Sequence, residues 1–176
     1  MYSLPFYYYN SPNRYIADIP MTKPEIIQCI IHNLKEDLSQ ATLAAEEALK
    51  GATHDQSKAE TQYDTLGLEH AYLAEGQSRR IETLGAEITR LDNWQAPDYS
   101  EEDEIFLGAL IVLEHLESDN QLSVFLAPAG GGQRVESLQL QVITPETPLG
   151  ATLLGRNIGD AVTLPNGEQY EISQLK

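Results

Sequence analysis

Two stretches of helical periodicity, joined by a polar segment, constrain this chain more than any other feature of its sequence. In the first stretch, apolar residues recur at the spacing of one helix face: Ile27, Ile30, Ile31, Leu34, Leu38, Ala41, Ala45, Ala48 and Leu49. The second stretch carries Leu66, Tyr72, Leu73, Ile81, Leu84, Ile88 and Leu91, and the last four have heptad spacing. Two such helices predict an antiparallel coiled-coil hairpin over residues 22–96, too thin to be a globular domain by itself.

Local signals mark where these helices begin and end. Thr22 can cap the first helix, and Pro24 suits its first turn. Gly51 predicts its end. The second helix is expected to start near Ser57 and to end before Pro97. The residues between the two helices should therefore form the tip of the hairpin.

Three carboxylates gather in this predicted tip. Asp55, Glu60 and Asp64 lie within ten positions of one another. A thin rod that ends in acids could deliver negative charge, or a metal ion, to a distant site. Each acid also has a purely structural interpretation: Asp55 could cap a turn, Glu60 could form a capping box with Ser57, and Asp64 could be part of a solvated helix face.

The sequence pattern changes after the hairpin. Residues 97–103 read as an acidic linker, and residues 104–176 as a small β domain. Strands are expected at Ile105–Leu113, Leu122–Leu126, Leu138–Ile143, Ala161–Leu164 and Gln169–Leu175. Thr147 and Pro148 should open a short helix, and Asn166-Gly167 predicts a hairpin turn. The expected fold class is α+β: a helical hairpin followed by an antiparallel sheet with one short helix. Residues 1–21 are expected to be a flexible tail.

Charge and composition exclude several functions. The formal net charge is −16, and residues 97–176 hold 13 acidic and 3 basic side chains, so unaided binding to duplex DNA is not expected. A basic protein groove or a bound cation is the more natural partner. The single cysteine, Cys29, allows no disulfide within the chain, and no apolar run could span a membrane, which fits a cytoplasmic protein. No nucleophile–base spacing suggests a self-contained enzyme.

One motif in the second half resembles a known family. Residues 142–155 read Val-Ile-Thr-Pro-Glu-Thr-Pro-Leu-Gly-Ala-Thr-Leu-Leu-Gly, followed by Asn157-Ile-Gly-Asp160 and Tyr170-Glu-Ile172. This pattern, placed after a coiled-coil hairpin, resembles the GreA/GreB transcript cleavage factors over residues 22–176. The resemblance implies an FKBP-like domain without isomerase activity that docks on the rim of the RNA polymerase secondary channel. The hairpin would enter that channel, where polymerase itself cleaves backtracked RNA.

The resemblance also implies site residues. Asp55 matches the first of two tip acids that help to hold a Mg²⁺ ion shared with polymerase, with no cofactor bound to the isolated protein. The second family acid, three residues later, is replaced here by Lys58. Glu60 is the expected substitute, as a catalytic and metal-binding residue, and Asp64 is a weaker candidate. The expected polymerase-docking residues are Thr147, Pro148, Leu149 and Gly150.

Lys58 keeps two alternatives open. The protein could occupy the channel without stimulating cleavage, because a lysine reverses the charge that the family places there. It could also be a coiled-coil adaptor for another protein that shares only the C-terminal fold.

Overall fold

The computed structural model describes residues 20–53, 66–164 and 166–176. The chain divides into two compact units. One unit, here called the β unit, combines the residues up to Ile30 with Trp94–Lys176. The other, here called the hairpin unit, is Ile31–Asn93. The predicted tip acids Asp55, Glu60 and Asp64, with Lys58, lie outside the described residues, as does nearly all of the predicted tail.

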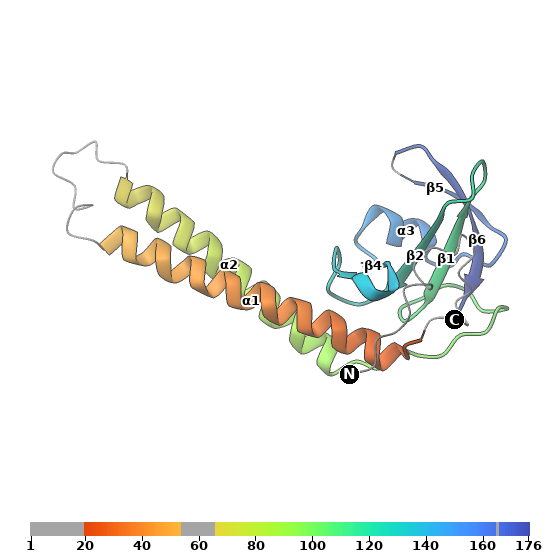
Figure 1. Ribbon diagram of the computed structural model, residues 1–176, viewed down its shortest axis with the longest axis horizontal. Coiled ribbons are helices and arrows are strands. Elements are labelled where there is room, and N and C mark those ends of the chain that lie inside the picture. The colour runs from red at the N-terminus through yellow and green to blue at the C-terminus, as the bar shows by residue number, and fades with distance from the viewer. Residues whose placement is uncertain (1–19, 54–65, 165) are drawn as a thin grey trace. The chain divides into compact units, whose positions relative to one another are not determined.

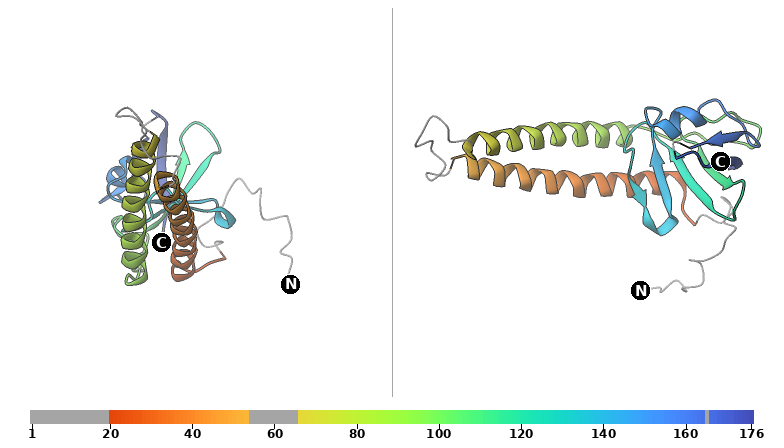
Figure 2. Two further views of the ribbon diagram at one scale, coloured as in Figure 1. Left: turned by 90° about the vertical axis from the view of Figure 1, so that its left-hand side faces the viewer. Right: turned by 90° about the horizontal axis from the view of Figure 1, so that it is seen from above.

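Two long helices run side by side in opposite directions, as the views in Figures 1 and 2 show. Helix α1 is Lys23–Thr53 and helix α2 is Leu66–Asp92. Thr22 and Glu25 close the start of α1 reciprocally. A Glu25 carboxylate oxygen accepts from the Thr22 N–H at 2.7 Å and from its hydroxyl at 2.9 Å, and the Glu25 N–H donates to the Thr22 hydroxyl oxygen at 3.4 Å. The bonds to the carboxylate lower the pKa of Glu25, the Thr22 N–H contributing most. The predicted pair of helices is confirmed.

The apolar stripes are buried over only part of the hairpin unit. Its buried apolar side chains are Ile31, Leu34, Ala41, Ala48, Leu84 and Leu91. Tyr72 and Leu73, which the sequence placed in the same stripe, are 64% and 57% exposed, so this part of the prediction is wrong. The stripe of α1 narrows to alanine in its second half, and alanine offers too little apolar surface to cover a facing leucine.

Six strands form one sheet in the β unit, in the order β3-β4-β2-β1-β6-β5. Their bounds are β1 Leu110–His115, β2 Gln121–Leu126, β3 Arg134–Val135, β4 Leu140–Ile143, β5 Ala161–Thr163 and β6 Gln169–Leu175. Helix α3 is Pro148–Leu153, and a 3₁₀ turn covers Glu136–Leu138. The α+β class is confirmed, but β2 and β4 pair in parallel, so the sheet is mixed and not antiparallel as expected.

Two predicted strands begin later than expected, each for a backbone reason. The stretch from Ile105 to Ala109 is not extended, because Gly108 has φ +102° and the Ala109 N–H bonds the carbonyl of Phe106 at 3.1 Å. The strand β4 begins at Leu140 because Gln139 adopts a left-handed conformation, with φ 49°. Neither turn leaves a clear signal in an apolar run.

The core of the β unit lies between the sheet and α3. Its fully buried side chains include Ile111 and Leu113 from β1, Val124 and Leu126 from β2, and Leu153 from α3. The partly buried side chains packed against this core are Tyr99, Leu107, Leu122, Leu149, Leu154, Ile158 and Leu164. Because Leu153 belongs to the core, α3 is held firmly against the sheet, and its outward residues are presented on a fixed scaffold.

The first turn of α1 belongs to the β unit and is tied to the segment that follows α2. Lys23 is 7% exposed; its ammonium donates to the carbonyl of Pro97 and lies 4.9 Å from the centre of the Tyr99 ring. Burial lowers the pKa of Lys23 to about 8, against the opposing effect of Asp98. Nearby, Trp94 packs on Phe125 of β2 with ring centroids 6.1 Å apart.

Candidate functional site

The turn that leads into α3 contains all four predicted docking residues. Thr147 caps the helix, because its hydroxyl oxygen accepts from the N–H of Gly150 at 3.1 Å and its hydroxyl donates to the carbonyl of Thr144 at 2.7 Å. Pro148 occupies the first helical position, where its fixed φ suits the helix and its missing N–H costs nothing. The Thr-Pro sequence therefore sets where α3 begins.

Gly150 is required by a close backbone contact. A Cβ atom at this position would lie 2.0 Å from the carbonyl oxygen of Thr144 and 2.9 Å from the hydroxyl oxygen of Thr147. Only glycine fits such an approach without moving the backbone. Thr147 and Gly150 thus shape this turn, while Gly150 itself is buried and offers no side chain to a partner.

The outward face of α3 carries no charge. Residues 147–155, here called the α3 strip, contain no acidic or basic side chain, and Pro148 and Ala151 are exposed. Leu149 is half-buried, with part of its surface against the core. Of the four predicted docking residues, Pro148 is exposed and Thr147 and Leu149 are half-buried, so a partner could contact these three side chains.

Sequence reasoning missed Phe106, an apolar residue on the surface of the same unit. Phe106 is 51% exposed, and it directly follows Ile105, which is fully buried. The sequence analysis assigned Phe106 to the predicted strand Ile105–Leu113, in which alternate residues would face opposite sides of the sheet. No local signal distinguished it, because an exposed and a buried aromatic residue look alike in an apolar run.

Several ionisable side chains of the β unit have pKa values that are shifted by local contacts or by burial. Asp103 accepts from the N–H of Ser100 at 2.7 Å and from its hydroxyl at 2.8 Å, and these bonds lower its pKa. Burial raises the pKa of Tyr99 and of Tyr170. Within residues 20–53, 66–164 and 166–176, no group of His, Cys, Asp and Glu could hold a metal ion.

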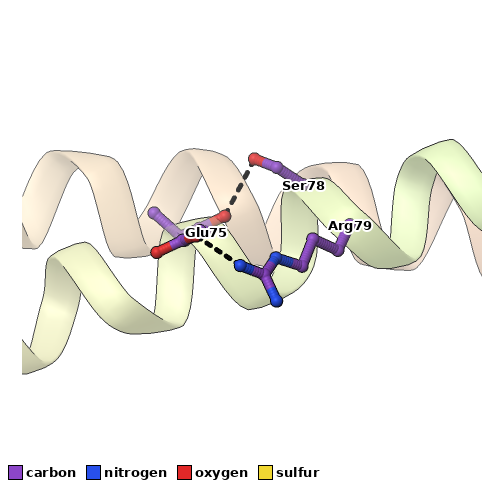
Figure 3. Close-up of polar contacts among 4 residues, drawn as sticks. Glu75, Ser78 and Arg79 are labelled. Carbon is purple, nitrogen blue, oxygen red and sulfur yellow. Dashed lines mark hydrogen bonds and ion pairs between the residues drawn. The ribbon is translucent and has the colours of Figure 1, made fainter.

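The surface of α2 is ordinary solvated helix. Figure 3 shows Glu75, Ser78 and Arg79 on neighbouring turns, with an ion pair of 2.7 Å between Arg79 and Glu75. Both side chains are more than half exposed, so this i,i+4 pair stabilises the helix by only about 0.3–0.5 kcal/mol. None of the described helices is long and apolar enough to cross a membrane.

These features define a class of protein: a long helical hairpin joined to a small β unit whose short helix presents an uncharged face. Residues 100–176 match the sequence profile of the C-terminal domain of the GreA/GreB transcription elongation factors. The chain therefore carries a GreA/GreB C-terminal domain. No curated protein matches the sequence.

Solved structures with similar chains bear related names. GreA factor homolog 1 (Gfh1) of Thermus thermophilus is 22% identical, with a TM-score of 0.37, over 83% of this chain and 94% of that one. Gfh1 of Thermus aquaticus is 22% identical, with a TM-score of 0.36, over 82% and 92%. A GreA/GreB factor from Nitrosomonas europaea is 18% identical, with a TM-score of 0.35, over 58% and 90%. The domain assignment depends on the sequence match at residues 100–176 and not on these structures.

Proposed function

We propose that this protein binds RNA polymerase, inserts the tip of its hairpin into the secondary channel and stimulates cleavage of backtracked RNA. The observation that carries the proposal is the GreA/GreB C-terminal domain at residues 100–176, preceded by helices of 31 and 27 residues. A helix of 31 residues is about 45 Å long, so a hairpin of this length could enter a deep channel. The protein would not itself be an enzyme, because the polymerase supplies the reacting centre.

The tip acids would be the working groups. Asp55 and Glu60 offer carboxylate oxygens, the ligand type that Mg²⁺ prefers, so the donor set fits a magnesium ion shared with polymerase. Such an ion would activate a water molecule and stabilise negative charge at the scissile phosphate. Asp55 and Glu60 would bind and orient that ion, while Asp64, four residues after Glu60, would add negative charge on the same helix face.

The α3 turn would be the docking element. In this proposal Pro148 and Leu149 contact the polymerase directly. Thr147 and Gly150 hold the backbone that presents them, as their hydrogen bonds and close packing support. A variant at Thr147 or Gly150 would therefore weaken docking through the shape of the turn.

Lys58 supports a second candidate function. It stands three residues after Asp55, where the related factors carry the second acid, and it places a positive charge beside the proposed metal ligands. A tip of this kind could occupy the secondary channel and leave the RNA uncut. The two candidates share the docking and differ only in the chemistry at the tip.

The deciding experiment is cleavage of RNA in a stalled, backtracked elongation complex at fixed Mg²⁺. The proposal expects faster cleavage with the wild type, and a loss of at least about tenfold in Asp55→Asn with polymerase binding unchanged. Glu82→Gln, the same loss of charge on the helix surface, is the matched control. Retained cleavage in Asp55→Asn would remove Asp55 from the site. No cleavage by the wild type, with cleavage gained in Lys58→Glu, would establish the second candidate.

A further inference from the structure

The β unit presents one large aromatic side chain beside its short helix. Phe106 is 51% exposed, although its neighbour Ile105 is fully buried. Ile105 donates its N–H to the carbonyl of Arg156 and accepts from the N–H of Gly155, each at 2.9 Å. Ile105 is therefore hydrogen-bonded to the end of the α3 strip, and Phe106 is the next residue along the chain.

The backbone that carries Phe106 is rigid. Its carbonyl accepts from the N–H of Ala109, and Gly108 adopts φ +102° within the same turn. A Cβ atom at Gly108 would lie 2.5 Å from Cδ of Pro97, so the turn is packed tightly against the linker. An exposed aromatic ring on a fixed backbone loses little conformational entropy when a partner covers it.

The exposed charged residues that flank this uncharged surface along the chain are mostly acidic, with Arg156 the exception. The run Glu101–Glu104 is exposed and ends two residues before Phe106, and the exposed Glu146 precedes the α3 strip. An aromatic residue and an uncharged helix face with a charged border have the composition of a protein-binding surface: an apolar centre inside a polar rim. The sign of the rim specifies a partner with basic side chains around an apolar pocket.

We infer that Phe106 is an anchor of the polymerase-docking surface, inserted into an apolar pocket of RNA polymerase whose Lys or Arg rim faces the acidic run Glu101–Glu104. This inference rests on the proposed function, and it extends the docking surface beyond α3. A second copy of this chain is a poor occupant, because it would bring the same acidic rim and a formal net charge of −16 against its like.

The chain offers a matched control for Phe106. Leu116, in the turn between β1 and β2, is 49% exposed, and its N–H bonds the carbonyl of Gln169 at 3.0 Å. It is thus also a large apolar side chain on a fixed backbone, but it lies in the β1–β2 turn and not beside α3. Phe106→Ala should weaken binding to core RNA polymerase by about tenfold or more, whereas Leu116→Ala should change it by less than about twofold.

Two further variants keep the test sharp. Phe106→Leu retains an apolar side chain and should recover most of the affinity, which a merely misfolded Phe106→Ala protein could not explain. Replacing all four acids at 101–104 by their amides should weaken binding at low salt and flatten its dependence on ionic strength. Thermal unfolding of each variant of the full chain checks that the fold is retained.

The outcomes separate this inference from the proposed function. Wild type that binds polymerase while Phe106→Ala and Leu116→Ala bind equally well would overturn the anchor and leave the proposed function standing. Wild type that fails to bind polymerase would overturn both. Self-association of the wild type that Phe106→Ala abolishes would make a second copy the occupant and would overturn the inference.

Discussion

The two units of this protein bury apolar surface to very different extents. In the β unit, side chains from β1, β2, β6 and α3 meet in one core where Ile111, Leu113 and Ile172 are fully buried. In the hairpin unit, two of the six buried apolar residues are alanines, Ala41 and Ala48, and Leu49 and Leu73 are more than half exposed. The β unit is therefore stabilised by an extensive apolar core, which can hold its surface residues in a fixed position. The hairpin unit depends on helical hydrogen bonds and on a few buried apolar side chains. The two parts should respond differently to substitution.

A large destabilising effect is expected at Gly150. A methyl group there would clash with the carbonyl of Thr144, so Gly150→Ala should lower the free energy of unfolding of the β unit by about 3 kcal/mol. Urea unfolding followed by the fluorescence of Trp94, the one tryptophan of the sequence, reports this unit, and circular dichroism at 222 nm reports mainly the long helices. The exposed neighbour Ala151, changed to Ser, is the control. An unchanged fluorescence midpoint would contradict the close contact.

The cost of replacing a leucine by alanine can be compared between the two units, at Leu113 in the β unit and Leu73 in the hairpin unit. Leu113 is fully buried, so Leu113→Ala should cost about 3–5 kcal/mol through lost burial and a cavity. Leu73 is 57% exposed, so Leu73→Ala should cost less than about 1 kcal/mol. The same two spectroscopic signals measure both variants. Equal costs would mean that Leu73 is covered in solution, and the contrast between the units would disappear.

The stability of the β unit should depend on pH through Lys23, which lies in the first turn of α1. Burial gives Lys23 a folded-state pKa of about 8, below the value near 10.5 of an exposed lysine. Between these values the unfolded chain binds more protons, so the contribution of Lys23 to stability should rise with pH and be lost below about 8. Unfolding measured at pH 7.5 and 9.5 should show the wild type gaining stability relative to Lys23→Met in the Trp94 transition. Parallel changes in both proteins would show that Lys23 is solvated.

Much of the helical architecture was predictable, because it follows from local spacing. The stripe from Ile27 to Ala48 and the cap at Thr22 gave α1, and Asn166-Gly167 correctly located the turn between β5 and β6. The parallel pairing of β2 with β4 was not predictable, because the partner of a strand depends on contacts far apart in the sequence.

The candidate site also has a part that local sequence predicts and a part that it does not. Thr147 and Pro148 were predicted to open a short helix, and the structure confirms this start with the hydrogen bond that caps it; their docking role, which the resemblance implied, stays a prediction. Phe106 was missed because an exposed and a buried aromatic look alike in an apolar run, and only the turn at Gly108 turns it outward. The roles of Asp55 and Glu60 stay predictions, because these residues lie outside the described structure.

The position of β6 has a consequence for how the chain folds as it is made. β6 lies inside the sheet between β1 and β5, and Lys176 exchanges both backbone hydrogen bonds with Leu110 at 2.9 Å. The long helices can form from local contacts as soon as they leave the ribosome, whereas the sheet lacks an interior strand until residue 176 has emerged. During synthesis, the edge of β1 that pairs with β6 would therefore stay unpaired until Gln169–Leu175 have been made, and an unpaired strand edge is a site where a nascent chain can aggregate.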